Sequence, residues 1–318
     1  MSSSTFTLTV TAREICQCWP WPKRNIITGK KYSMPIKIIP TTTAAHLAKK
    51  FPKNSVVWPK GNRDGKFIFP DGEVYAALPD LDKNTRYVVL HSGMPRPNEG
   101  LMELKIILEI LKNNSIPNIE VCFSYFPYGM QDNVFDPGEI NVAESLIKEF
   151  CEYYPVKKIF VLDAHFAGKD WVKKYPLENI PVFEWLKKDV TKSHPDIIFL
   201  APDCGGQQRT GLTGLNKKRV NSHAVEVEHS ANLKKVVQNR VVGVVDDIIE
   251  TGSTLERFSE ECQKCGAKAS VAIITHGVLE KGIKRIKKSY QKIFLTNSIN
   301  RKEANVDIAP LLIKHLHI

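Results

Sequence analysis

Hydrophobic and polar residues alternate along this chain in blocks that predict strands separated by helices. Apolar, β-branched runs predict two successive sets of strands, at residues 35–39, 87–92, 119–124 and 158–163, and then at 196–201, 240–247, 269–275 and 292–296. Between them, apolar residues recur near helical spacing at 101–112, 142–153, 254–264 and 282–289. Strands that alternate with helices form parallel sheets, so we expect an α/β fold.

One predicted strand leads into a segment with distinctive chemistry. Its apolar run ends in Asp246 and Asp247, and a short turn of small residues then opens a helix. Open α/β sheets bind ligands at such carboxyl ends of strands. The turn can aim backbone N–H groups and hydroxyls at a phosphate, helped by the positive end of the helix. Its residues are Thr251, Gly252, Ser253 and Thr254.

The two carboxylates have a different use from the turn. They suit ribose hydroxyls, which they could hold directly or through a metal, so the whole segment predicts a ribose-5-phosphate site. A simple helix cap after a buried strand would account for Ser253 or Thr254. It would not account for two adjacent carboxylates at the end of the strand.

Composition narrows the class of protein. The 318 residues suffice for two α/β domains with their own cores. The net charge of +11 suits anionic substrates, nucleic acid or a membrane surface. However, the Lys and Arg residues are spread along the chain without interleaved aromatics, so nucleic acid is not expected as a partner. No apolar run is long enough for a bilayer and no signal peptide is evident, so we expect a cytoplasmic protein without membrane association.

The seven cysteines carry little further information. An odd number argues against a complete disulfide framework and fits a reducing compartment. The close pairs Cys16/Cys18 and Cys262/Cys265 could form a zinc site only if they met in space. We favour the interpretation that Cys262 and Cys265, three residues apart on a predicted helix, pack in the core.

The loop at 246–254 resembles the phosphoribosyl-pyrophosphate loop shared by type I phosphoribosyltransferases and ribose-phosphate pyrophosphokinases. Other motifs resemble the pyrophosphokinase family in order and rough spacing: FPDGE at 69–73, LMEL at 101–104, YFPYGMQD at 125–132, DAH at 163–165, APDCGG at 201–206, ITHGVL at 274–279 and VDIAPLL at 306–312. The resemblance runs from about residue 35 to the end of the chain. This ordered set favours a pyrophosphokinase over a true phosphoribosyltransferase.

The resemblance implies two tandem phosphoribosyltransferase-like domains with mostly parallel sheets. We expect an N-terminal extension at 1–33 with no counterpart in the family, an N-terminal domain at 34–179 and a C-terminal domain at 180–297 that carries the loop. Residues 298–318 are expected to pack back on the first domain. The family also implies a homo-oligomer, either a dimer or a hexamer.

The resemblance further implies Mg²⁺-dependent transfer of a diphosphoryl group from ATP to the 1-hydroxyl of ribose 5-phosphate, with release of AMP. The residues that match the family's sites are Asp246, Asp247, Glu250, Thr251, Gly252, Ser253 and Thr254 for ribose phosphate, His165 and Asp203 for the metal, Phe69, Asp71, Glu73, Gln131 and Asp132 for ATP, and the catalytic Lys217 and Arg219. The family usually supplies the first three ATP residues from a neighbouring subunit.

Simpler interpretations stand beside several of these assignments. A lone histidine such as His165 is often structural. Asp71 and Gly72 also suit a hairpin turn. The basic stretch at 216–219 could be a solvated loop.

The chain also departs from the family pattern. Met130, Asn133, Val134, Phe135 and Gly138 stand where the family has basic residues, Glu250 and Ser253 replace an aspartate and a glycine, and the segment at 207–215 is shortened. One hypothesis is an inactive regulatory homologue that binds active subunits. The other is an active enzyme with a different acceptor, such as a 5′-substituted ribose phosphate like ADP-ribose in NAD salvage. The retained carboxylates, His165 and Asp203 favour the second.

Overall fold

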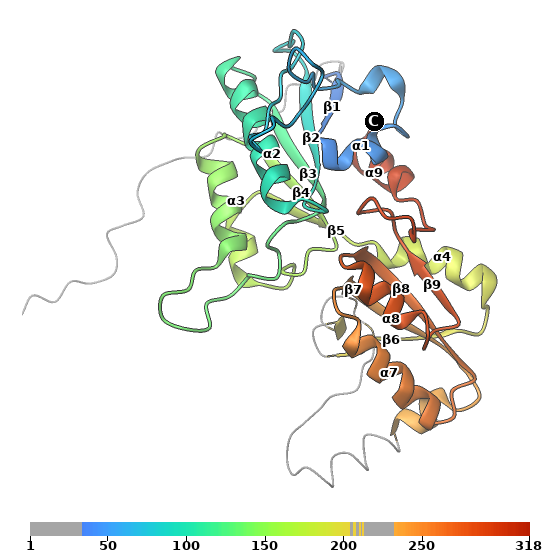
Figure 1. Ribbon diagram of the computed structural model, residues 1–318. Coiled ribbons are helices and arrows are strands. Elements are labelled where there is room, and N and C mark those ends of the chain that lie inside the picture. The colour runs from blue at the N-terminus through green and yellow to red at the C-terminus, as the bar shows by residue number, and fades with distance from the viewer. Residues whose placement is uncertain (1–33, 204–205, 208–209, 211, 213–231) are drawn as a thin grey trace, which may run out of the picture. The chain divides into compact units, whose positions relative to one another are not determined.

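The computed structural model describes residues 34–203, 206, 207, 210, 212 and 232–318 (Figure 1). Met34–Ile318 cluster as one compact unit. It contains a five-stranded sheet and a four-stranded sheet, and every strand pair is parallel. This confirms the predicted α/β fold. The extension at 1–33 lies outside the described residues, and the domain boundary near residue 180 stays a prediction.

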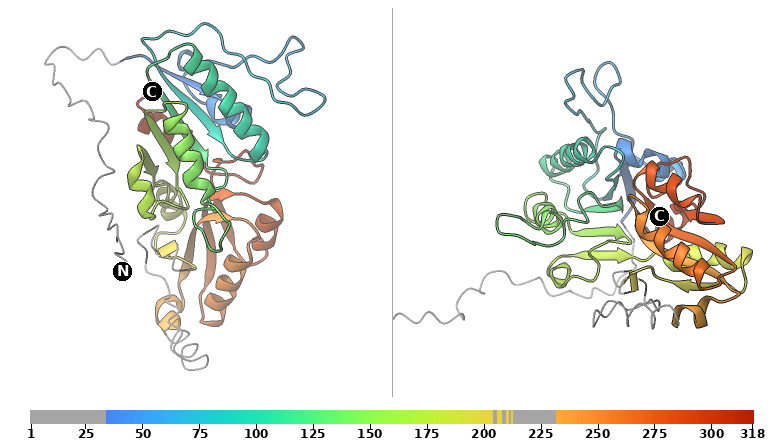
Figure 2. Two further views of the ribbon diagram at one scale, coloured as in Figure 1. Left: turned by 90° about the vertical axis from the view of Figure 1, so that its left-hand side faces the viewer. Right: turned by 60° about the horizontal axis from the view of Figure 1, so that its bottom comes forward.

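The first sheet has the order β1-β2-β3-β4-β5. Its strands are β1 (Ile36–Pro40), β2 (Arg86–Ser92), β3 (Ile119–Tyr125), β4 (Lys158–Leu162) and β5 (Leu177–Ile180). Helices α2 (Pro97–Asn113) and α3 (Val142–Glu152) cover one face, and the short α1 (Ala45–Ala48) and α9 (Ala309–Leu316) cover the other (Figure 2). The 3-10 helices are η1 (Thr42–Ala44), η2 (Lys53–Ser55) and η3 (Asp170–Lys174).

Cover on both faces explains why the central strands β2, β3 and β4 are apolar at most positions. In β2, Tyr87 and Val89 belong to the core under α2 and α3, whereas Val88 and Leu90 belong to the core on the opposite face. Successive side chains of a strand point to opposite faces, so a strand buried on both sides reads as a continuous apolar run. That pattern made the central strands recognisable from sequence.

The second sheet has the order β6-β7-β8-β9. Its strands are β6 (Ile198–Leu200), β7 (Val241–Ile249), β8 (Ala269–Gly277) and β9 (Lys292–Leu295). Helices α7 (Ser253–Lys264) and α8 (Glu280–Ile286) pack on one face and α4 (Phe183–Ser193) packs on the other. The eight strands predicted from sequence are all present, with ends that differ by up to two residues.

Strand β5 and helices α4 and α9 were not predicted, and neither were the short α1 and the 3-10 helices. Strand β5 has only four residues, and its polar Glu178 and Asn179 interrupt the apolar run. Helix α4 buries only Phe183, Leu186 and Val190 at helical spacing, among lysines and other polar residues. Helix α9 lies in the C-terminal tail, for which the sequence pattern predicts no helix.

The C-terminal tail contacts the first sheet at several points. The Leu316 carbonyl accepts a hydrogen bond from Arg86 Nη2 (2.9 Å), and the Ser298 carbonyl accepts from Ser124 Oγ (2.8 Å). His315 Nε2 pairs with Glu178 of β5. Strand β5, which precedes the second sheet in the sequence, and the C-terminal tail, which follows it, therefore contact each other at the first sheet.

The cysteines and the membrane prediction can be compared with this fold. Cys262 and Cys265 are both buried in the core under α7, which agrees with packing as their role. Cys16 and Cys18 lie outside the described residues. No helix in the described part of the chain is long and apolar enough to cross a membrane.

Candidate active site

Strand β7 and the loop after it carry the predicted ribose-phosphate residues. The strand continues through Asp246 and Asp247 to Ile249, two residues further than predicted. Asp247 is buried, and its N–H donates to Asp246 Oδ1 at 3.0 Å. Helix α7 then begins at Ser253, so the loop between strand and helix is short. The carboxylates thus lie on the rigid end of a central strand rather than on the loop itself.

Two glycines allow this loop to pack against α8. Gly252 caps α7 in the left-handed region at φ 74°, and a Cβ there would lie 2.8 Å from the Gly282 carbonyl oxygen. A Cβ on Gly282 would overlap the carbonyl oxygen of Glu250. Arg285 of α8 adds a hydrogen bond from Nη1 to the Thr251 carbonyl at 3.2 Å. Helix α8 therefore packs directly against the backbone of the loop.

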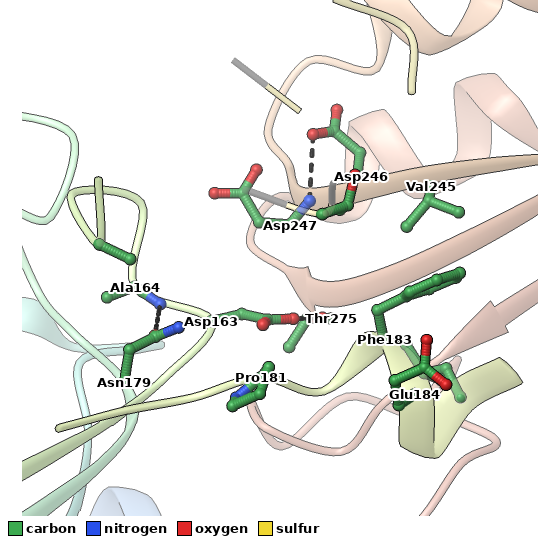
Figure 3. Close-up of a pocket in the computed structure, with 13 residues that line it drawn as sticks. Asp163, Ala164, Asn179, Pro181, Phe183, Glu184, Val245, Asp246, Asp247 and Thr275 are labelled. Carbon is green, nitrogen blue, oxygen red and sulfur yellow. Dashed lines mark hydrogen bonds between the residues drawn. The ribbon is translucent and has the colours of Figure 1, made fainter. Parts of the chain in front are cut away.

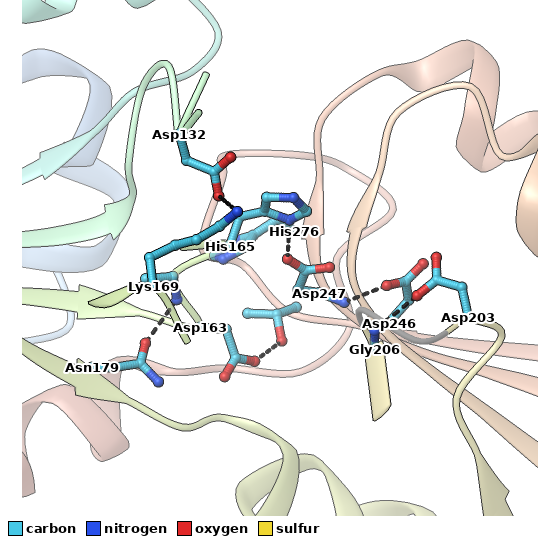
Figure 4. Close-up of polar contacts among 12 residues, drawn as sticks. Asp132, Asp163, His165, Lys169, Asn179, Asp203, Gly206, Asp246, Asp247 and His276 are labelled. Atoms are coloured by element: carbon cyan, nitrogen blue, oxygen red, sulfur yellow. Dashed lines mark hydrogen bonds and ion pairs between the residues drawn. The ribbon is translucent and has the colours of Figure 1, made fainter. Parts of the chain in front are cut away.

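A histidine from the first sheet meets a carboxylate from the second. His165 follows β4, and its Nδ1 lies 2.9 Å from Asp247 Oδ2 (Figure 4). The His165 side chain is 29% exposed, whereas that of Asp247 is 7% exposed. Because Asp247 engages Nδ1, Nε2 is the nitrogen that can bind a ligand.

A cavity of about 180 Å³ gathers most of the predicted residues. Its lining includes His165, Asp203, Asp246, Asp247, Glu250, Thr251, Gly252, Ser253, Thr254 and Met130. Asp203 is oriented by the Gly206 N–H, which donates to its Oδ1 at 2.8 Å. The structure thus brings the predicted metal residues and the predicted ribose-phosphate residues to one place, although they come from segments far apart in sequence.

The predicted ATP residues at 69–73 form a separate exposed turn. Phe69 N–H donates to the Glu73 carbonyl at 2.8 Å, and Gly72 adopts φ 94° at the tip. Asp71 and Glu73 are exposed and do not line the cavity. The hairpin interpretation of Asp71 and Gly72 therefore holds. It is compatible with a role for these side chains in another subunit, which stays a prediction.

The second predicted ATP pair, Gln131 and Asp132, differs in exposure. Gln131 is exposed, but Asp132 is buried, and its Oδ2 lies 3.5 Å from Lys169 Nζ (Figure 4). Sequence reasoning missed Lys169. The available signal was its position four residues after His165 on the same segment. The predicted catalytic residues Lys217 and Arg219 lie outside the described residues.

The segment after β3 presents apolar side chains where the family pattern has cations. Met130, Val134 and Phe135 are 47%, 58% and 77% exposed. The turn is closed by Glu139, whose carboxylate accepts the N–H groups of Phe135 and Asp136, and these hydrogen bonds lower the pKa of Glu139. Met130 also lines the cavity, so one side of it carries an apolar side chain.

Two side chains near the carboxylates, the buried His276 and the partly buried Tyr125, keep neutral forms. Burial lowers the pKa of His276 to about 4, although the Asp247 charge opposes this shift. The His276 ring is held by Ser298 Oγ (2.9 Å) and by the Leu162 carbonyl (3.1 Å). Burial, followed by the charges of Glu250 and Asp247, raises the pKa of Tyr125 to about 12. His276 therefore acts as a neutral tie between the two sheets at neutral pH.

Comparisons with known proteins agree with these observations. Residues 36–152 match the model of the N-terminal domain of ribose phosphate pyrophosphokinase, and residues 207–311 match that of the phosphoribosyl transferase domain. The ribose-phosphate pyrophosphokinase of Mycoplasmopsis pulmonis is 27% identical over 270 residues, covering 78% of this chain and 83% of the relative. That of Pyrococcus furiosus is 28% identical over 260 residues, covering 78% and 90%. The crystal structure of phosphoribosylpyrophosphate synthetase from Mycobacterium smegmatis shares the fold, with a TM-score of 0.72 at 20% identity over 89% of this chain and 97% of that one.

The paired parallel sheets and the strand–loop–helix segment at β7 define the class of the protein as an α/β protein of the phosphoribosyltransferase type. Within that class, the N-terminal match separates the pyrophosphokinases from the phosphoribosyltransferases. The chain belongs to the ribose-phosphate pyrophosphokinase family, a family of diphosphotransferases, as its motifs predicted.

Proposed function

We propose that this protein transfers the β,γ-diphosphoryl group of ATP to the 1-hydroxyl of a ribose 5-phosphate moiety and releases AMP. The observation that carries the proposal is the single cavity lined by Asp246, Asp247, the loop residues, His165 and Asp203. Its donors match the needs of a sugar phosphate and of a metal-bound polyphosphate. The names of the relatives, all ribose-phosphate pyrophosphokinases, support the same reaction.

The sugar phosphate is assigned to β7 and its loop. Backbone N–H groups and hydroxyls at 251–254 would bind the 5′-phosphate at the start of α7, where the helix dipole favours an anion. Asp246 and Asp247 would accept hydrogen bonds from the ribose hydroxyls. The 1-hydroxyl oxygen then attacks the β-phosphorus of ATP, the bond from that phosphorus to the α,β-bridging oxygen breaks, and AMP leaves with the electron pair while the hydroxyl proton passes to solvent.

The donor set fits Mg²⁺ as a cofactor shared with substrate. Among the described residues, no group of three or more His, Cys, Asp or Glu side chains is arranged to hold a metal alone. Mg²⁺ commonly takes one or two protein ligands and completes its shell with phosphate oxygens and water. His165 and Asp203 line the same cavity and would be those ligands. When bound, the ion would neutralise negative charge on the transferred phosphates.

Other parts of the proposal rest on the family alone. Lys217 and Arg219 would stabilise negative charge on the transferred group. Phe69, Asp71 and Glu73 would bind adenine in a neighbouring subunit of a homo-oligomer. We also propose a cytoplasmic location, because ATP and phosphorylated sugars are found there.

We further propose that the acceptor is not plain ribose 5-phosphate alone. Glu250 and Ser253 change the cradle for a terminal phosphate, and the exposed Met130 places an apolar surface on the same cavity. A 5′-substituted ribose phosphate such as ADP-ribose offers the same 1-hydroxyl together with a nucleoside that could contact this surface.

One experiment tests both parts. The protein is incubated with ATP, Mg²⁺ and either ribose 5-phosphate or ADP-ribose, and AMP release is followed by chromatography to give two specificity constants. The Asp246→Asn/Asp247→Asn double variant is the matched control, because it keeps side-chain size and removes both charges. We expect AMP release that is lost in the double variant. A clear preference for ribose 5-phosphate would reject the substituted acceptor, and no AMP with either acceptor would favour the regulatory homologue.

A further inference from the structure

The turn that carries His165 has an unusual backbone. Asp163 follows β4 with φ 36°, in the positive region that L-residues other than Asn and Asp seldom adopt. Ala164 and His165 come next, so the conformation at Asp163 sets the direction in which His165 leaves the sheet. A residue in such a conformation needs the surrounding structure to hold it there.

Three side-chain hydrogen bonds hold this turn, in addition to the Asp163 N–H, which donates to the Ile180 carbonyl at 3.0 Å, and their partners lie around the end of β5 and in β8. The Val182 N–H donates to Asp163 Oδ1 at 3.0 Å, and the Thr275 hydroxyl donates to Asp163 Oδ2. The Ala164 N–H donates to Asn179 Oδ1 at 2.7 Å. Figure 3 shows Asp163 directed towards Thr275, and Ala164 towards Asn179. Thr275 belongs to β8, so Asp163 ties the end of β4 to the second sheet.

One side of the turn borders a cavity, although Ala164 itself packs in the core of the first sheet. A cavity of about 110 Å³ is lined by Asp163, Ala164, Asn179 and Thr275, together with Asp246 and Asp247. The cavity reduces packing on this side of the turn, so the polar contacts contribute to holding its backbone. The next residue of β8 reinforces the tie, since His276 Nε2 lies 3.1 Å from the Leu162 carbonyl, immediately before Asp163.

We propose that Asp163 is a positioning residue, which acts with Thr275 to hold the His165 turn so that Nδ1 meets Asp247 and Nε2 is presented to the substrate cavity. Asp163 itself contacts no substrate in this account. Only the expected effect of Asp163 on catalysis rests on the proposed function. The geometric part, namely that the Asp163–Thr275 contact sets the His165–Asp247 pair, stands on the contacts alone.

The test uses an isosteric change at the donor. Thr275→Val removes the hydroxyl and keeps the shape, whereas Thr275→Ser keeps the hydroxyl and serves as the matched control. Steady-state rates are measured for each variant in the parental protein and in the His165→Ala background. Loss of a hydrogen bond to a charged group predicts a fall in kcat of about tenfold or more for Thr275→Val, with the serine variant near the parent. If Thr275 acts through His165, Thr275→Val causes no further loss in the His165→Ala background. Multiplied losses, or a Thr275→Val variant as active as the parent, would overturn the proposal.

A second measurement requires no activity and no metal. Proteins with ¹⁵N-labelled histidine are compared by NMR at one fixed pH, and the His165 imidazole signals are assigned from their absence in His165→Ala. We expect both His165 nitrogen shifts to move in Thr275→Val and to stay at the parental values in Thr275→Ser. Unchanged His165 shifts in a folded Thr275→Val protein overturn the proposal. Absence of AMP release from the parent would reject the proposed function instead, and the NMR comparison would still decide the positioning role.

Discussion

Gly282→Ala should impair ribose-phosphate binding, although the substitution favours the helix. Gly282 lies in α8, and alanine in a helix is ordinarily more stable than glycine by about 1 kcal/mol. Here the added Cβ would overlap the Glu250 carbonyl oxygen and lie 3.0 Å from the Glu250 carbonyl carbon. Normal carbon contacts are about 3.5–4.0 Å, so the loop or the helix must move by roughly 1 Å.

That displacement would fall on the phosphate-binding loop. The two Glu250 atoms belong to the backbone and the third contact is Ile249 Cγ2 at 3.0 Å, so movement of a side chain alone cannot relieve the overlap. A misplacement of about 1 Å can cost up to about a hundredfold in rate. We expect KM for the ribose phosphate to rise by about tenfold or more, while KM for ATP changes little because the predicted ATP residues lie elsewhere. The overlap should also outweigh the helix preference, so that the variant loses about 1–3 kcal/mol of stability.

The assay combines AMP-release kinetics, with one substrate varied at a time, and urea unfolding. Lys281→Ala is the matched control, since it changes the adjacent exposed residue of α8 to the same side chain. A Gly282→Ala protein that is more stable than the parent, with an unchanged KM for the ribose phosphate, would refute the close contact between α8 and the loop. An equal rise in both KM values would show that the loop is not specific to the sugar phosphate.

Three further predictions concern other parts of the protein. His165→Ala should raise the Mg²⁺ concentration needed for half-maximal AMP release, and overlapping titrations would make His165 structural. Mixing an Asp246→Asn protein with a Glu73→Ala protein should restore activity if sites are shared between subunits; no recovery despite proven subunit exchange would place each site within one chain. Stability should fall as the pH drops below about 6.5, because burial lowers the pKa of His91 to about 3 and that of His276 to about 4, so the unfolded chain binds more protons in this range. Each histidine then contributes a slope of about 1.4 kcal/mol per pH unit, which urea unfolding at pH 7.5 and 5.5 would measure, and His91→Gln should reduce the slope.

The sequence predicted the parts of the fold whose signals are local. Strands β2, β7 and β8 are buried on both faces and therefore form long apolar runs. Strand β5 was missed because its few residues include Glu178 and Asn179, and α4 because its apolar stripe is narrow. Whether these segments form a strand or a helix depends on the elements they pack against, and those elements are distant in the sequence.

The candidate site divides in the same way. The loop after β7 was recognisable, because carboxylates, small residues and a helix start follow one another directly. The pairing of His165 with Asp247 was not, since it joins residues 82 positions apart across two sheets. Asp163 and Thr275 lie within the DAH and ITHGVL motifs, but their hydrogen bond was not predicted, because they are 112 positions apart and meet only in the folded chain.

One core cluster has a consequence for how the chain unfolds. It combines Val88 and Leu90 of the first sheet with Val245 and Ile273 of the second, and α4 and α9 complete it. Because both sheets contribute to this cluster, unfolding of one sheet would expose the apolar side chains of the other to water. The described part of the chain should therefore melt as one cooperative unit, and a ligand that binds only the β7 loop should protect amide hydrogens in the first sheet from exchange as well.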